Sequence, residues 1–460
     1  MSRGPDGNGH ASRRGFLVAT AGLAAAAGTG FGAGAATQAV AEAEAPSGPG
    51  ARRLHRTEPF WGEHQSGIVT PAQSHTYFAA FDLTTTARGD VVNLLQAWTE
   101  AAARLTAGKT AQPLGDGLKP VEAQGGAGAQ AKAYGAYAAP GASIIAADSG
   151  ETLGLAPARL TLTFGFGAGL FVKDGKDRYG LAARRPEALV EMQRFVGDQL
   201  VAAHTGGDLA VQACADDLQV AFHAVRQLAR IADNVAQIRW VQSGFIPEFA
   251  AKDNPRNLMG FRDGTDNPSA ADPEAMARIV WVGSEGPDWM RGGSYFVVRR
   301  IRIALEHWDR MKVAFQEQTI GRQKYSGAPL RRKNEFDALD LKATDKDGSP
   351  VVPENAHVRL AAAASNDGAQ ILRRSYSYND GANLTAERWP PWRQGMEYDA
   401  GLFFGAYQRD PRTGFIKIYD RMSKFDMMNQ FVTHVGGGLF ACPGGTAAGE
   451  FIARRLFDKA

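Results

Sequence analysis

The chain has 460 residues, of which 44% are hydrophobic and 22% are charged, so it can bury a large core and is longer than one small domain needs. Its formal net charge is +3, and its 51 Lys and Arg residues are dispersed, which argues against a nucleic-acid partner. Cys214 and Cys442 are the two cysteines, which excludes a disulfide-dense scaffold, a Cys-rich zinc module and a cysteine-ligated iron–sulfur cluster. We expect two separate buried thiols, and one disulfide between them is the alternative.

The N-terminus predicts an export signal over residues 1–41. Residues 12–17 read Ser-Arg-Arg-Gly-Phe-Leu, a twin-arginine pattern, and a weakly apolar Ala/Gly run follows to Ala36. A membrane-spanning helix needs roughly 20 strongly apolar residues, so no stable membrane insertion is expected. Cleavage is expected at 39–41 or 41–43. We therefore predict export by the twin-arginine machinery to a secreted, extracellular or cell-envelope location, and this route often carries proteins that fold around a cofactor.

A flexible N-terminus is expected over 42–58, with Pro46, Pro49 and two glycines. Hydrophobic periodicity then predicts elements in chain order: a strand at 77–83, a helix at 91–105, a strand at 160–167, a helix at 186–203, a strand at 208–215 and a helix at 217–235. A second, similar series follows: strands at 239–245 and 293–303, a helix at 304–318, and a strand and helix between 402 and 431.

The alternation of apolar and polar residues in these strands favours antiparallel sheets with one face covered by helices. The fold class is therefore α+β. Because the two series resemble each other, we expect two domains of similar composition, at 59–235 and 236–460. A short amphipathic helix at 451–457 closes the chain, and since no docking tail follows it, packaging inside a protein shell is not expected.

A polar segment at 324–359 separates the last predicted elements. Long ordered loops inside compact domains are usually functional. Asp345 and Asp347 hint at a calcium loop, but the other ligands of such a loop are missing, and a simple Asp-Gly turn is the preferred interpretation.

His357, in Glu-Asn-Ala-His-Val-Arg-Leu, is the first candidate for a metal ligand, because a neutral imidazole binds ferric haem while its second nitrogen is held by a carboxylate or carbonyl. The ordinary interpretation is a histidine without a ligand role. Other histidines stay open on spacing alone: His64, His75, His204 and His434. Four are discounted because they lie in the leader, the flexible start or helical patterns: His10, His55, His223 and His307.

Asp263 lies in Gly260-Phe-Arg-Asp-Gly264, where the flanking glycines let the backbone approach a flat cofactor closely. A carboxylate there can move a proton from the near to the far oxygen of a bound peroxide. The alternative is a surface turn, which Asp-Gly followed by Asn267-Pro268 would also explain.

Arg373 lies 16 residues after His357, which is far enough for the chain to reach the other side of a planar cofactor. A permanent cation there would polarise the O–O bond and stabilise the departing charge. Arg374 is expected to point to the opposite side, because neighbours on a strand alternate faces; contact with a haem propionate is the alternative. A solvated arginine pair is the ordinary interpretation of both.

With these residues in view, the chain resembles the dye-decolorising peroxidases, and is most similar to their exported, twin-arginine, deferrochelatase-like branch. The resemblance runs from Pro59-Phe-Trp-Gly-Glu-His-Gln-Ser-Gly-Ile to Gly438-Leu-Phe-Ala-Cys-Pro. It implies two ferredoxin-like domains of the dimeric α/β barrel type, with antiparallel sheets flanked by helices. It also implies one haem b per chain, bound mainly by the C-terminal domain, and the absence of Cys-x-x-Cys-His requires that this haem be non-covalent.

The family's motifs match residue by residue. Its Gly-x-x-Asp-Gly signature implies that Asp263 is the distal acid beside Gly264. Its His-apolar-Arg pattern implies that His357 is the proximal ligand, and its Arg-Arg pair before Ser-Tyr-Ser-Tyr implies that Arg373 is the distal arginine.

The chain also departs from the family pattern. Ser375 stands where some branches carry an asparagine, so distal hydrogen bonding should differ. No carboxylate is evident as the partner of the proximal histidine, and Asp367 is the nearest candidate.

The expected function is a haem b peroxidase in which hydrogen peroxide oxidises dyes, phenolics or a similar organic donor by one-electron steps through a ferryl intermediate. The first alternative is a deferrochelatase-like protein that binds haem and releases iron, and the second is a non-enzymatic scaffold domain. If donors are too bulky to reach the haem, an oxidisable surface residue would relay electrons. The candidates are Tyr376, Tyr378, Trp389 and Trp392.

Overall fold

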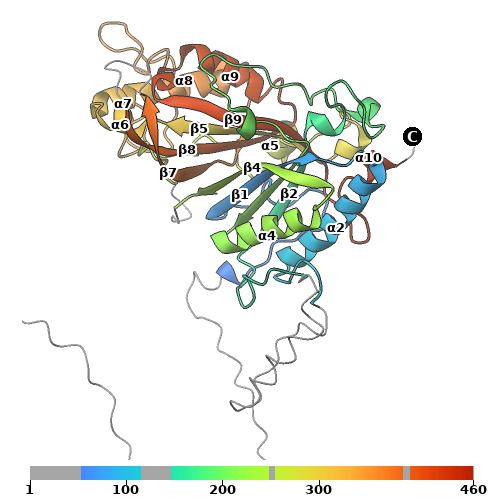
Figure 1. The fold of residues 1–460 in the computed structure, drawn as a ribbon. Coiled ribbons are helices and arrows are strands. Elements are labelled where there is room, and N and C mark those ends of the chain that lie inside the picture. Colours follow the sequence, from blue (N-terminus) through green and yellow to red (C-terminus); the bar gives the residue numbers. More distant parts are fainter. Residues whose placement is uncertain (1–52, 115–146, 248–253, 387–393, 459–460) are drawn as a thin grey trace, which may run out of the picture. The chain divides into compact units, whose positions relative to one another are not determined.

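The computed structural model describes residues 53–114, 147–247, 254–386 and 394–458 (Figure 1). The described residues belong to one compact unit. The predicted export signal and its cleavage sites lie outside the described residues, as do Trp389 and Trp392. No helix among the described ranges is long and apolar enough to cross a membrane.

The first half of the described chain is a βαββαβ unit. It comprises β1 (His75–Leu83), α2 (Arg88–Thr106), β2 (Thr161–Phe166), β3 (Leu209–Ala215), α4 (Leu218–Ile231) and β4 (Ala236–Phe245). The strands pair antiparallel in the order β2-β3-β1-β4. Helices α2 and α4 pack on one face of this sheet, shown in blue and green in Figure 1.

Local sequence explains where these helices lie. Asp217 caps α4 by accepting hydrogen bonds from the backbone N–H groups of Gln219 and Val220. Apolar side chains at helical spacing, including Leu95 and Trp98 of α2 and Leu228 of α4, bury one face of each helix in a common core.

The second half repeats the same strand order. Its strands β5 (Ser294–Ile303), β7 (Tyr376–Ala386), β8 (Gln394–Gln408) and β9 (Val432–Cys442) pair antiparallel as β9-β5-β8-β7, and the short β6 (Leu372–Arg373) pairs with the end of β8. The remaining α-helices are α5 (Pro273–Ile279), α6 (Leu305–Asp309), α7 (Val313–Ile320), α8 (His357–Ala361), α9 (Phe415–Phe425) and α10 (Arg454–Phe457). The 3-10 helices are η2 (Ala168–Leu170), η3 (Ala182–Arg184), η4 (Ala202–His204), η5 (Asp288–Met290), η6 (Ala363–Ser365) and η7 (Met427–Gln430).

Single residue pairs join the two sheets at both edges, Phe166 with Ala441 and Phe245 with Ser377, so eight strands close into a barrel. Large side chains fill its interior: Phe78, Trp240, Phe296, Tyr378, Phe403, Tyr407 and Phe440. The predicted fold class, α+β with two ferredoxin-like units, is confirmed. The division into domains at residue 236 stays a prediction, and the strand that begins there, β4, pairs with β1.

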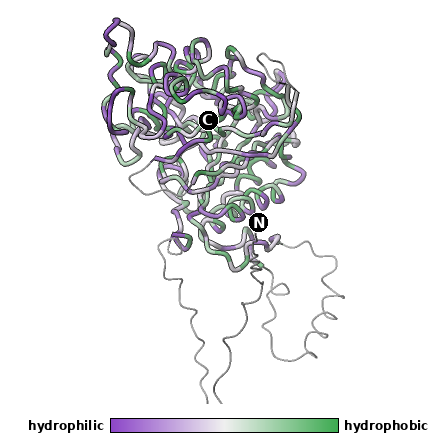
Figure 2. The backbone as a smooth tube through the Cα atoms, turned by 90° about the vertical axis from the view of Figure 1, so that its left-hand side faces the viewer, coloured by the Kyte–Doolittle hydropathy of each residue, from purple (hydrophilic) through white to green (hydrophobic). Residues whose placement is uncertain are grey.

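Figure 2 shows hydrophilic and hydrophobic residues interspersed along the chain, the pattern from which the strands were predicted. Two helix predictions were wrong in part. Residues 186–203 form no α-helix, because the N–H groups of Gln199 and Val201 donate to the carbonyls of His434 and Val435 beside β9. The helix predicted at 304–318 is divided into α6 and α7, and neither β7 nor β9 was predicted.

The polar segment between α7 and α8 contains turns and no α-helix or strand. The Asp345 carboxylate accepts hydrogen bonds from the N–H groups of Asp347 and Ser349, which is the simple turn preferred from the sequence. Cys214 and Cys442 are both buried free thiols.

Candidate active site

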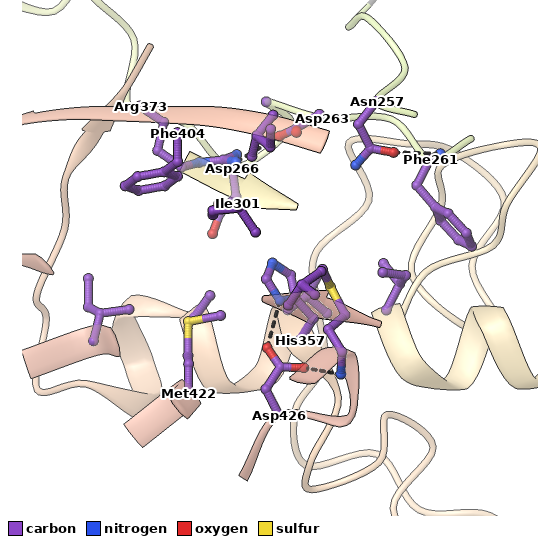
Figure 3. A pocket seen from close by; sticks show the side chains of 18 of the residues that line it. Asn257, Phe261, Asp263, Asp266, Ile301, His357, Arg373, Phe404, Met422 and Asp426 are labelled. Atoms are coloured by element: carbon purple, nitrogen blue, oxygen red, sulfur yellow. Dashed lines mark hydrogen bonds and ion pairs between the residues drawn. The ribbon is translucent and has the colours of Figure 1, made fainter. Parts of the chain in front are cut away.

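A cavity lies between the second sheet and the helices that cover its outer face (Figure 3). Because side chains alternate along a strand, Ile301 and Ile303 of β5 and Leu402 and Phe404 of β8 face this cavity, whereas Phe403 faces the barrel interior. Helices α8 and α9 contact each other and supply the opposite wall. Its apolar lining also includes Phe261, Ile320, Val358, Phe415, Ile418 and Met422.

His357 is the first residue of α8, and its ring is partly exposed on the cavity wall. Its Nδ1 lies 2.7 Å from Oδ2 of Asp426, whose side chain is 3% exposed. An ionised carboxylate only accepts hydrogen bonds, so Nδ1 carries the proton and Nε2 keeps its lone pair. Figure 3 shows this pair on one side of the cavity. The arrangement is that of an oriented metal-ligating imidazole.

Asp426 is the functional residue that sequence reasoning missed, and the choice of Asp367 was wrong. Asp367 is exposed and pairs with Lys417. Asp426 lies 69 residues from His357 and is fixed by a second role, since it caps η7 by accepting from the N–H of Met428 at 2.8 Å. A capping aspartate after an amphipathic helix was the one local signal, and it does not indicate a histidine partner.

Asp263 and Arg373 lie across the cavity from His357 (Figure 3). Nη1 of Arg373 donates to Oδ1 of Asp263 at 2.7 Å, and both side chains are partly exposed. The structure therefore brings together the three residues predicted from the sequence, with the imidazole on one side and the ion pair on the other. A planar ligand between them would meet a nitrogen ligand on one face and an acid/base group with a cation on the other.

The pKa of Asp263 is lower than that of an ordinary aspartate. Burial raises it, but the charge and hydrogen bond of Arg373, with a hydrogen bond from Asn257, outweigh burial. Asp263 is therefore ionised at neutral pH and can accept a proton. The same ion pair holds the guanidinium of Arg373 toward the cavity.

Asn267 fixes the strand that carries Arg373. Its Oδ1 accepts from the backbone N–H of Arg373 at 2.8 Å, and its Nδ2 donates to the Arg373 carbonyl at 2.9 Å.

Gly260 and Gly264 both have positive φ, at +86° and +113°, so the loop that carries Asp263 needs glycine at both positions. Gly264 lines the cavity.

Arg374 is not brought to this cavity. Its side chain points to the other face of the strand, where Nη1 donates to the carbonyl of Thr70 and Nη2 donates to Gln73, and it is 7% exposed. The alternation predicted from the sequence is thus observed, and contact with a propionate has no support.

Tyr376 and Tyr378, two of the residues predicted as surface electron relays, are buried, at 1% and 0% exposure, so neither is the surface residue that a relay requires.

Of the described histidines, His357 and His434 line the cavity. Nε of Arg299 donates to Nδ1 of His434 at 3.0 Å. Burial and the charge of Arg299 hold the pKa of His434 well below its usual value. The neutral ring therefore carries its proton on Nε2, which leaves no free ring nitrogen for a metal. Of these two histidines, His357 is the one with a free ring nitrogen that could bind a metal.

The lining fits haem b. A flat apolar macrocycle matches the aliphatic and aromatic walls, and the free Nε2 of His357 matches an iron ligand. Arg262 and Arg322 on the same lining are the cations that could hold propionates. A second cavity reaches Asp263, Gly264 and Arg373 from the side of the first sheet, next to Ser375. It provides a separate approach to the acid and the arginine.

Comparison with known proteins is in line with this geometry. Residues 65–246 match the family model for the N-terminal part of Dyp-type peroxidases, and residues 254–447 match that for the C-terminal part. Deferrochelatase from Escherichia coli K12 is 34% identical over 409 residues, covering 87% of each chain. Proteins of this family bind haem b non-covalently.

The chain is also similar to solved structures of Dyp-type peroxidases. DtpA from Streptomyces lividans is 37% identical, with a TM-score of 0.73 over 88% of this chain and 98% of its own. A Dyp-type peroxidase from Streptomyces coelicolor, also 37% identical, has a TM-score of 0.74 with the same coverage. One from Cellulomonas bogoriensis is 36% identical, with a TM-score of 0.73 over 88% of this chain and 99% of its own.

Proposed function

The chain belongs to the Dyp-type peroxidase family, and on this premise we propose that it is a haem b peroxidase that uses hydrogen peroxide to oxidise dyes, phenolics or similar donors by one-electron steps. One observation carries the proposal. The His357–Asp426 pair and the Asp263–Arg373 pair face each other across one apolar cavity, with hydrogen bonds of 2.7 Å in each pair.

Each polar residue has a defined task in this proposal. His357 would hold the haem iron through Nε2, and Asp426 keeps the proton on Nδ1 and would make the imidazole a stronger electron donor to the iron. The haem, when bound, supplies the redox chemistry of peroxide cleavage and donor oxidation. The apolar walls exclude water from its faces.

Asp263 moves the proton of the peroxide. As an ionised carboxylate it could take a proton from one oxygen of the peroxide and return it to the other, which would leave as water when the O–O bond breaks, with the two electrons supplied by the bound haem. Arg373 is always charged, so it stabilises the negative charge that develops on the departing oxygen and keeps Asp263 ionised.

The first test is the absorption spectrum of the purified protein and of His357→Ala, before and during rapid mixing with hydrogen peroxide. We expect a Soret band in the parent that changes on mixing, and a lost or altered band in the variant. His64→Ala is the matched control, since His64 stacks on Trp281 at 3.8 Å outside the cavity lining and should leave the spectrum unchanged. A parent protein that cannot bind haem would contradict the proposal. An unchanged spectrum in His357→Ala would show that another residue is the iron ligand.

A second function, removal of iron from haem, is supported by the 34% identity to deferrochelatase. Product analysis distinguishes iron extraction from peroxidase activity. Intact protoporphyrin after incubation with haem supports iron extraction, whereas haem retained through many peroxide turnovers supports the peroxidase.

We also propose export by the twin-arginine route, on the evidence of Arg13 and Arg14 in the leader. Replacing both by lysine should leave the protein inside the cell with its haem bound. Export that is unchanged in that variant would contradict this route.

A further inference from the structure

A second cluster of ligand-type side chains lies in the first half of the molecule, away from the haem cavity. It consists of Asp148, Glu151 and His223, whose potential ligand atoms lie within 4.8 Å of one another. His223 belongs to α4, and the two acids belong to the loop that precedes β2. None of the three lines the haem cavity. Asp148 is 5% exposed and His223 is 2% exposed.

The two nitrogens of His223 face different carboxylates. Nδ1 lies 3.1 Å from Oε1 of Glu151, which is hydrogen-bond distance, and Nε2 lies 3.5 Å from Oδ2 of Asp148. Nε2 is buried and has no hydrogen-bond partner among the described residues. If Nδ1–H donates to Glu151, the neutral ring directs a lone pair toward the carboxylate of Asp148. That arrangement is repulsive unless a cation lies between them.

The distance favours a metal ion over a direct hydrogen bond. N–H···O bonds in proteins are about 2.7–3.2 Å long, so 3.5 Å is too long for a good one. Ligand atoms around a tetrahedral zinc ion, bonded at about 2.0–2.1 Å, lie about 3.4 Å apart. The observed separation therefore matches two ligands of one ion.

The surroundings fix the ligands and leave the charge of one acid uncompensated. The Asp148 carboxylate accepts from the N–H groups of Ala111 and Gly150, at 3.0 and 2.8 Å, and no Lys or Arg pairs with it in the described part of the chain. Glu151 receives Nη1 of Arg226 at 3.1 Å. Glu151 therefore already has a cation and acts as the acceptor that orients the imidazole.

We propose that this cluster binds a divalent metal ion of the zinc class. Nε2 of His223 and Oδ2 of Asp148 are its ligands, Glu151 holds Nδ1–H in a carboxylate–histidine–metal arrangement, and water completes the shell. Imidazole with carboxylate suits zinc better than magnesium or calcium, which prefer oxygen ligands alone. The ion would connect the 147–155 loop to α4, so it would act on stability and be independent of the haem chemistry.

The test is calorimetric titration of the full-length holoprotein, freed of metal by a chelator, with zinc chloride and, separately, magnesium chloride. We expect one zinc per chain with micromolar affinity, no comparable magnesium binding, and an increase of several degrees in Tm with zinc. Asp148→Asn, which keeps the shape of the side chain, should weaken zinc binding at least tenfold, and His223→Gln should abolish it. His55→Gln removes an exposed histidine outside the cluster and should leave binding unchanged.

Anomalous scattering from zinc-soaked crystals of the parent keeps the proposal falsifiable if the variants fold poorly. A peak at bonding distance from Nε2 of His223 supports it. Absence of zinc binding by the parent would overturn it and favour a protonated His223 that donates to both acids. Zinc binding that survives unchanged in a folded Asp148→Asn would also overturn it.

Discussion

At the scale of single residues, the site depends on two hydrogen-bonded pairs that set the protonation of groups on opposite sides of the cavity. Asp426 fixes the tautomer of His357, and Arg373 lowers the pKa of Asp263. In each pair, the charge of one partner determines where the other carries its proton or whether it is ionised. Changing the charge while keeping the shape is therefore the informative experiment.

Asp426→Asn tests the proximal pair. An amide keeps the shape but accepts the Nδ1 proton more weakly, so the imidazole becomes a poorer donor. We expect the reduction potential of the haem iron to rise and haem affinity to fall by about 10–100-fold. Spectroelectrochemistry and haem transfer to apomyoglobin measure both quantities. Asp367→Asn, at an exposed aspartate paired with Lys417, is the matched control and should change neither.

Arg373→Leu tests the distal pair through its pH dependence. Because the pKa of Asp263 lies below its ordinary value, the ionised base persists to lower pH, and the acid limb of kcat/KM for peroxide should lie below the pKa of an ordinary aspartate in the parent. Without the cation, burial raises this pKa, and the acid limb should move to higher pH. The rate at neutral pH should fall at least about 100-fold.

Arg278→Leu, at an exposed arginine outside the cavity lining, is the control for that experiment. Its pH profile should match the parent's. An acid limb that stays in place in Arg373→Leu would show that Asp263 does not set it.

At the scale of elements, the position of the distal groups depends on a loop and a two-residue strand. The loop that carries Asp263 turns at two glycines with positive φ, and β6 is held by pairing with β8 and by the side chain of Asn267. The sequence identified the glycine turn, because Gly-x-x-Asp-Gly is local. It did not identify Asn267 as an anchor, because its partner lies 106 residues away.

Asn267→Ala tests this anchor. It removes two hydrogen bonds to the backbone of Arg373, each contributing about 1 kcal/mol, so Arg373 should become mobile while it remains charged. We expect kcat/KM for peroxide to fall about tenfold with the acid limb nearly in place, unlike Arg373→Leu. Asn334→Ala, at an exposed loop residue, should leave the rate unchanged. Parent-like kinetics in Asn267→Ala would show that Asn267 does not position Arg373.

Among the elements, local patterns predicted most strands and the helices α2, α4 and α9. The prediction failed at 186–203, where apolar spacing suggested a helix but the backbone donates to the chain beside β9. It also omitted β7 and β9. Such errors arise where long-range hydrogen bonds decide the conformation, since tertiary partners override local preference.

At the scale of the whole molecule, the two sheets share one barrel interior, so the haem-bearing half depends on the other half. Arg374 connects them from inside: it extends from the segment after β6 to Thr70 and Gln73 before β1. Its neighbour Arg373 faces the cavity. Of these two neighbouring arginines, one thus connects the two halves of the barrel and the other faces the cavity.

Arg374→Met tests this division. The apolar side chain fills part of the space but leaves the part-buried carbonyl of Thr70 and the buried side-chain oxygen of Gln73 without this donor, which should cost about 1–3 kcal/mol for the buried Gln73 acceptor. We expect a clearly lower Tm with a parent-like Soret band, whereas Arg373→Leu should retain the parental Tm and lose activity. A parental Tm in Arg374→Met would show that this connection contributes nothing to stability.

The sequence by itself determined the α+β class, the repeated strand series and the three residues His357, Asp263 and Arg373, because each is marked by local alternation or by a short motif. The tertiary structure decided the barrel closure, the partner of His357, the anchor of Arg373 and the separate face of Arg374. These depend on contacts between segments tens to hundreds of residues apart. Local spacing carries no information on such contacts, since only the packed chain places Asp426 beside His357.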